Sequence, residues 1–177
     1  MTTLYRRLLG DKFDRLPPTL RDFHQVDRER HFHAKFKITR GKGFFKNVVA
    51  KLGGLPPAGE NVPMRLRVVP DGEREHWHRE FGKHKLSSIQ WEQNGLLMEK
   101  LGPVTLAFRL ETDSTTLYLH RVKAWGLNFL RLPLFLAPNG EGIETGQENG
   151  CAIIARASMP LLGQLVQYEG LVLPEES

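Results

Sequence analysis

Cysteine is almost absent from this chain. Cys151 is the single cysteine among 177 residues, so no intrachain disulfide bond can form. Proteins without disulfides are typical of reducing compartments, and we therefore expect a cytoplasmic location. Long apolar runs are missing too: no stretch reaches the roughly 20 apolar residues of a membrane-spanning helix, and residues 1–10 contain no signal-peptide core. We expect a protein that is neither exported through a signal peptide nor transmembrane.

The motifs of common enzyme classes are missing as well. No G-x-S-x-G nucleophile elbow occurs, and Gly41-x-Gly43 is too short for a phosphate-binding or dinucleotide-binding glycine loop. Glu141 and Glu144 are a pair of carboxylates, but they lie in an acidic, turn-rich stretch where we expect both to be solvated. Cys151 follows a turn and is expected to be a small core or edge residue. The sequence therefore predicts no catalytic residue and no cofactor.

Charged and hydrophobic residues are present in globular proportions, at 25% and 40%. The length fits one domain over residues 1–177. Net charge is +5, but residues 21–51 hold nine Lys or Arg against three Asp or Glu, whereas residues 138–177 hold one against six. The basic segment raises nucleic-acid binding as an alternative. We favour a solvated basic strand, because its aromatic residues alternate away from the lysines instead of sharing their face.

The N-terminal third changes from helical to strand periodicity. Residues 1–24 are predicted to be a helical entry segment, broken by Leu16-Pro17-Pro18. Apolar and polar side chains then alternate over residues 31–39, which predicts a half-buried strand. Residues 44–52 have the spacing of a short amphipathic helix that ends at Gly53-Gly54.

Beyond residue 60 the pattern predicts strands separated by short turns such as Asp71-Gly72 and Asn94-Gly95. We place these strands at residues 64–68, 77–81, 86–91, 96–101, 104–111, 117–124, 141–148, 151–157 and 165–173. The predicted fold is α+β and mainly antiparallel β. A single curled sheet over residues 31–173 forms a calycin-like or lipocalin-like barrel or half-barrel, with N-terminal helices and a helix inserted after the first strand.

Residues 127–136 interrupt the strands with seven Leu or Phe and one charge, Arg131. Pro133 argues against one long helix, so we expect a short helical or irregular crossover. It either caps the barrel mouth or contacts a lipid surface, or it closes the barrel end as ordinary core. We favour core, and exposure of the segment decides between these interpretations.

Several turn motifs span nearly the whole chain. They are LYRRLLG at residues 4–10, LPP at 16–18, GLPPAG at 54–59, LGP at 101–103, MPLLG at 159–163 and YEG at 168–170. In these motifs the chain resembles the bacterial family called domain of unknown function 4166. The resemblance implies a fold unit that occurs alone or appended to reductase-like domains, and it implies no functional residue. We expect a stand-alone copy, with a reductase partner as one hypothesis.

Two histidine pairs are the candidates for a metal site. Strand alternation places His31 with His33, and His76 with His78, on one face of their strands, as a barrel metal site requires. Both pairs lie opposite apolar residues of the same strands, so we expect the histidines to face water. We favour no metal site.

The apolar side of the sheet is the candidate ligand site. Curled antiparallel sheets of this size often enclose a cavity. We expect it to be lined by eight side chains: Phe32, Phe36, Trp77, Phe81, Leu106, Phe108, Phe129 and Phe135.

The leading functional hypothesis is therefore non-enzymatic binding of a hydrophobic small molecule or lipid. An enzyme, or an enzyme accessory domain acting on a hydrophobic substrate in the same cavity, is the alternative, and it would be favoured by His or Glu side chains that point into the barrel. A docking module for a reductase partner is the third hypothesis.

Overall fold

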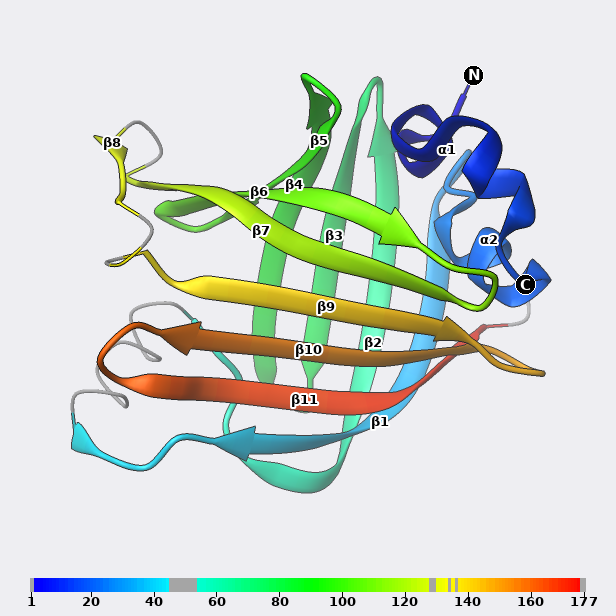
Figure 1. Ribbon diagram of the computed structural model, residues 1–177. Helices are drawn as coiled ribbons and strands as arrows, with labels where there is room; N and C mark the ends of the chain where they lie inside the picture. Colours follow the sequence, from blue (N-terminus) through cyan, green and yellow to red (C-terminus); the bar gives the residue numbers. More distant parts are fainter. Residues whose placement is uncertain (1, 45–53, 128–129, 134, 136, 176–177) are drawn as a thin grey trace.

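The computed structural model describes residues 2–44, 54–127, 130–133, 135 and 137–175 (Figure 1). The α-helices α1 (Leu4–Leu9) and α2 (Pro18–His24) come first, joined by the 3₁₀ helix η1 (Gly10–Arg15). The strands that follow are β1 (Arg30–Arg40), β2 (Gly59–Asp71), β3 (Arg74–Phe81), β4 (His84–Gln93), β5 (Leu96–Leu101), β6 (Val104–Thr112), β7 (Thr116–Gly126), β8 (Leu130–Arg131), β9 (Asn139–Gly146), β10 (Cys151–Met159) and β11 (Gly163–Pro174).

The strands form a closed antiparallel barrel of ten strands. Each long strand pairs with the next along the chain, β7 pairs with β9, and β1 pairs with β11 to close the circle. The two-residue strand β8 pairs with the end of β7. Strands β2 to β5 form one layer in Figure 1, and β6, β7, β9, β10 and β11 form a second layer that crosses it. The predicted antiparallel barrel is confirmed, and it is closed rather than a half-barrel.

Alternating burial along β1 shows why the sheet has an inner and an outer face. Phe32, Ala34, Phe36 and Ile38 are buried in the interior, and the polar residues between them face outward. Tight turns keep successive strands adjacent. The Asn94-Gly95 turn has φ angles of 55° and 71°, which match the twist of a two-residue hairpin.

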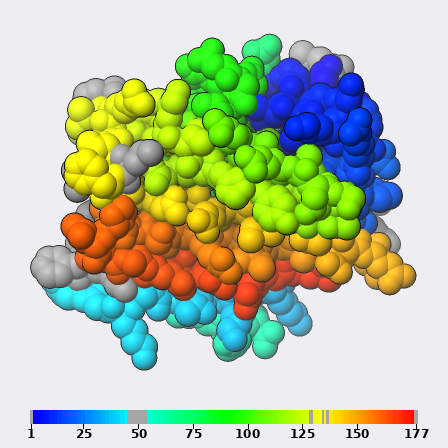
Figure 2. Space-filling model, in the orientation of Figure 1, coloured from blue at the N-terminus to red at the C-terminus, as the bar shows by residue number. Residues whose placement is uncertain are grey.

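The N-terminal segment covers one end of the barrel, as the dark blue atoms show in Figure 2. Gly10 ends α1 with a φ of 54°, and Pro18 is preorganised for the first turn of α2. Phe13 and Leu20 are completely buried and belong to the same apolar core as the strands. The predicted helical entry segment is confirmed.

Of two predictions about connections, one falls outside the described residues and one is corrected. The helix expected at residues 44–52 lies, from residue 45 on, outside the described residues. In the hydrophobic crossover, Leu127, Leu130 and Phe135 are exposed, so the interpretation of this segment as ordinary core is wrong for these three side chains. Pro133 follows the short strand β8, whose two residues pair with the end of β7. No helix among the described residues is long and apolar enough to cross a membrane.

Candidate ligand cavity

A cavity of about 170 Å³ lies inside the barrel. One wall is apolar because inward positions of the strands carry large hydrophobic side chains, among them Phe36, Phe81, Leu86 and Phe108. Small residues leave the space of the cavity open. Gly140 and Gly142 on β9 have no side chain, and Ala155 and Ala157 on β10 have only a methyl group. The strand pattern therefore produces a space that hydrophobic groups can occupy.

The opposite part of the cavity is polar. Arg79 forms an ion pair with Glu99 at 3.3 Å (Nη2 to Oε1) and donates a hydrogen bond to Ser88 at 2.8 Å. Ser88 and Gln90 both donate to Glu99 Oε1, at 2.6 and 3.2 Å. The Tyr5 hydroxyl donates to Gln90 Oε1 at 3.1 Å. These side chains form one network, which we call the polar floor.

Strand period and register place the polar floor. On β3 the inward positions carry Glu75, Trp77, Arg79 and Phe81 in turn, so polar and aromatic side chains share one face. Gln90 lies opposite Glu75 on one side and opposite Glu99 on the other. Glu99 comes to the interior from β5, and Tyr5 reaches the floor from α1. Four separate elements thus supply one hydrogen-bonded cluster.

A second polar pair lies beside the floor. His24 at the end of α2 is completely buried, and its Nε2 donates to Glu144 Oε2 at 2.5 Å. The Tyr5 ring stacks on the His24 imidazole with 3.6 Å between ring centroids. Glu144 lines the cavity, whereas His24 lies behind it. A carboxylate oriented by a buried imidazole is therefore available to a molecule in the cavity.

Glu75 is the most perturbed carboxyl in the interior. Burial raises its pKa from 4.5 to about 7, and the nearby His24 and the hydrogen bond from Trp77 offset part of this rise. Trp77 Nε1 donates to Glu75 Oε2 at 3.1 Å. The other oxygen, Oε1, has no hydrogen-bond partner among the described residues. Glu75 is consequently a buried acid that is half protonated near neutral pH.

Burial also keeps three other interior groups neutral. It raises the pKa of the Tyr5 and Tyr168 hydroxyls, with the carboxylates of the interior adding to the shift. Both tyrosines line the cavity as uncharged phenols. Burial and the charge of Glu144 raise the pKa of the Cys151 thiol, so this buried cysteine is a poor nucleophile. The prediction that Cys151 is a core or edge residue is confirmed.

Comparison with known proteins identifies the family. The family described as Domain of unknown function (DUF4166) matches residues 16–172. This chain belongs to the DUF4166 family. No curated protein and no solved structure is matched by it. The family match covers most of the barrel. Because no curated protein or solved structure matches, the chemistry of the cavity in this DUF4166 protein follows from its own residues.

The structure separates the eight residues expected to line the cavity. Five of them do line it: Phe36, Trp77, Phe81, Leu106 and Phe108. Phe32 is buried in the core, where its ring packs edge-on against Phe23 at 4.9 Å between centroids. Phe129 lies outside the described residues. Phe135 does not line the cavity, because its side chain is on the surface.

The histidine pairs of the DUF4166 chain lie on the outer face of the barrel. His31 is half-exposed and pairs with Glu29 at 2.8 Å, and His76 pairs with the exposed Asp71 at 3.3 Å. His78 contacts Ser87 at 3.1 Å, and burial together with Arg67 lowers its pKa. His33 is exposed. Within the described part of the chain no three His, Cys, Asp or Glu residues are grouped to hold a metal ion.

The polar floor was not expected, and one expectation about a carboxylate is wrong. Glu144 is not solvated, because it is only 8% exposed and its carboxylate is hydrogen-bonded to His24. The signal for Glu75 and Arg79 was present in the sequence, because the alternation that turns Trp77 inward also turns these two residues inward. Residues of this kind on a strand are usually assigned to solvent, which is why the signal was missed.

Proposed function

We propose that this barrel binds a small, mostly apolar molecule that carries one polar group. The apolar part lies against the aromatic wall around Phe36, Phe81 and Phe108. The polar group meets the floor formed by Arg79 and Glu99. The observation that carries the proposal is this division of one cavity into an apolar wall and a hydrogen-bonded floor, the usual composition of a small-molecule site.

The cavity volume limits the ligand. A volume of about 170 Å³ is close to that of an apolar cavity of about 150 Å³ that holds one benzene molecule. A ligand of about seven or eight non-hydrogen atoms, or one end of a longer molecule, would fill it. The proposal is non-enzymatic binding of this kind of hydrophobic molecule.

A pair of probe molecules tests the proposal. Toluene and p-cresol have the same apolar ring, and p-cresol adds one hydroxyl, which would form a hydrogen bond with the polar floor. In an NMR titration of the isotope-labelled chain, we expect both to shift resonances of cavity-lining residues. We expect p-cresol to bind about tenfold tighter, because a hydrogen bond to a charged group contributes about 1.5 kcal/mol or more.

Two alanines on one strand supply the variant and its control. Ala155→Leu fills part of the cavity from β10 and should weaken binding of both probes. Ala152→Leu places the same side chain on the outer face of β10 and should leave binding unchanged. Shifts confined to the surface, or equal loss in both variants, would show that the interior is not the site. Equal affinity for the two probes would remove the role of the polar floor.

Glu144 favours a second candidate function, acid–base catalysis on a hydrophobic substrate in the same cavity. Its carboxylate lines the cavity and is hydrogen-bonded to His24 at 2.5 Å, an arrangement suited to moving a proton.

Hydrogen exchange of cyclohexanone in D₂O tests this second function. Glu144 would take a proton from the carbon beside the carbonyl, and a deuteron from solvent would replace it. NMR loss of that C–H signal, abolished by Glu144→Gln, supports catalysis; exchange no faster than in buffer rejects it. Docking on a reductase partner stays a prediction.

A further inference from the structure

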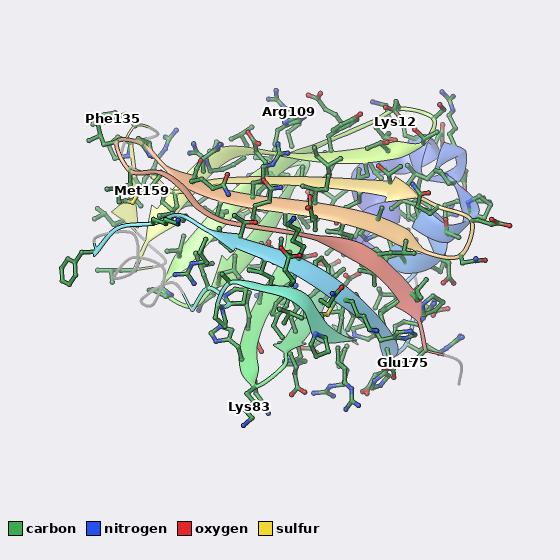
Figure 3. The ribbon with its side chains drawn as sticks, turned by 90° about the horizontal axis from the view of Figure 1, so that it is seen from below. Lys12, Lys83, Arg109, Phe135, Met159 and Glu175 are labelled. Carbon is green, nitrogen blue, oxygen red and sulfur yellow. The ribbon has the colours of Figure 1, made fainter. Side chains whose placement is uncertain are left out.

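Exposed apolar side chains gather at the edge of the barrel that faces away from α1 and α2. Among the described residues, five large hydrophobic side chains of this edge are highly exposed: Phe44 76%, Leu127 64%, Leu130 55%, Phe135 69% and Leu161 98%. In Figure 3, Phe135 and Met159 lie at one side of the molecule, and Lys12 and Glu175 lie at the other. We call the edge that carries these five residues the apolar rim.

Strand register shows that the loops of the apolar rim are neighbours. Phe44 follows the end of β1, and Arg40 near that end pairs with Val166 at the start of β11. Leu161 lies in the turn between β10 and β11. Ser158 near the end of β10 pairs with Asn139 at the start of β9, the strand that follows the crossover. The described parts of three connections distant in sequence therefore lie at the same edge of the barrel.

The charge of the apolar rim has one sign. Residues 41–58, 127–138 and 160–162 contain no Asp or Glu. Lys42, Lys123 and Arg131 are exposed there, and no ion pair joins any of them to a carboxylate within the described ranges. Lys123 and Arg131 border one shallow hollow of about 350 Å³ at the end of β7. Two unpaired cations around a hollow suit one phosphate head group.

The opposite edge has a different character. Its turns carry Glu73, Asp113, Glu148 and Glu175, and the N-terminal segment that covers that end holds charges of both signs, six Lys or Arg against five Asp or Glu in residues 2–29. The molecule thus differs along the barrel, from a polar end of mixed charge to a basic and apolar one. A planar anionic surface would orient such a molecule with the apolar rim toward it.

We propose that the apolar rim docks on an anionic phospholipid bilayer. Leu127, Leu130, Phe135 and Leu161 insert between head groups, and Lys123 with Arg131 binds a lipid phosphate. Exposed apolar and basic side chains that come from separate connections fit a deformable lipid surface, whereas a second copy of this chain would bring a rim of the same positive sign. The docking does not depend on ligand binding in the cavity.

Sedimentation with vesicles tests this docking on the full chain. At about 0.1 M salt, where the screening length is about 10 Å, we expect at least tenfold more binding to vesicles of phosphatidylcholine with 30% phosphatidylglycerol than to phosphatidylcholine alone. Binding should fall as salt rises. Equal binding to both vesicle types, or none to either, overturns the proposal.

Matched variants separate the rim from the rest of the surface. Phe135→Ser with Leu161→Ser should lower vesicle binding about tenfold, while Leu171→Ser, at an exposed leucine of β11 away from the rim, should not. Lys123→Glu with Arg131→Glu should abolish the preference for anionic vesicles.

Lys12→Glu with Arg15→Glu makes the same charge change on the exposed surface of η1 and should leave binding unchanged. Because all these side chains are exposed, circular dichroism should show an unchanged fold. Loss of binding in the Leu171 or Lys12 controls equal to that in the rim variants contradicts the assignment. A dimer in light scattering that Leu161→Ser dissociates shows that the rim joins two copies instead.

Discussion

One substitution, at Glu75, tests whether burial makes an ionised carboxylate unfavourable in the barrel interior. Its pKa of about 7 in the folded protein, against 4.5 for the ordinary carboxyl, means that the folded state holds the proton more tightly than the unfolded chain does. At about 1.4 kcal/mol per pKa unit, ionisation of Glu75 costs the folded state about 3 kcal/mol.

The sign of the pH dependence follows from proton binding. Between pH 4.5 and about 7 the folded state keeps the proton while the unfolded chain has lost it, so the free energy of unfolding falls as pH rises. The stabilisation is complete below pH 4.5 and is lost above about pH 7. Glu75→Gln imitates the neutral acid and still accepts the hydrogen bond from Trp77.

Urea unfolding followed by tryptophan fluorescence measures the effect. We expect Glu75→Gln to match the wild type near pH 4.5 and to be more stable by about 3 kcal/mol at pH 8. Glu73→Gln, the same change at an exposed residue two positions away, should stay within about 0.5 kcal/mol at both pH values. A Glu75→Gln variant that is no more stable than the wild type at pH 8 would refute the description of Glu75 as a carboxyl destabilised by burial.

Three further predictions concern the core, the polar floor and the thiol. Phe13→Ala should lower the free energy of unfolding by about 3–5 kcal/mol in the same urea assay, because Phe13 is fully buried, whereas Phe135→Ala at the surface should change it by about 0.5 kcal/mol or less. Arg79→Met should cost about 3–5 kcal/mol by leaving Glu99 unpaired, and the double variant Arg79→Met with Glu99→Met should lose less than the single one; additive losses would contradict the pairing. The Cys151 thiol should react with a disulfide reagent in urea and not in the folded state, and rapid labelling of native protein would show that it is accessible.

Much of the barrel could be predicted because one physical rule repeats along it. A sheet with one buried face needs apolar side chains at every second position, and β1 obeys this rule from Phe32 to Ile38 without exception. Two-residue turns such as Asn94-Gly95 then fix which strands are adjacent. Closure of the barrel could not be predicted, because pairing of β1 with β11 joins residues from the two ends of the chain.

The candidate site was harder to predict than the fold. The His24–Glu144 pair joins residues 120 positions apart and depends on how α2 lies against β9. Neither residue has a local pattern that marks it as buried. Glu75 and Arg79 do have one, since they share the inward face of β3 with Trp77 and Phe81, but side chains that carry charge are normally placed in solvent by sequence reasoning.

Neither the interior nor the apolar rim has the composition that would make the fold most stable, because the interior contains polar groups and the rim exposes apolar side chains. A buried ion pair such as Arg79–Glu99 rarely adds stability over apolar residues of similar volume, and a cavity beside it removes packing contacts. Exposed Leu127 and Leu161 add nothing to the core. The cavity lining extends from Gln90 on the polar floor to Leu101, at the last position of β5 and toward the rim. Both departures from that composition are what the two proposals require, since polar groups inside would meet the polar end of a bound ligand and apolar groups outside would meet a bilayer.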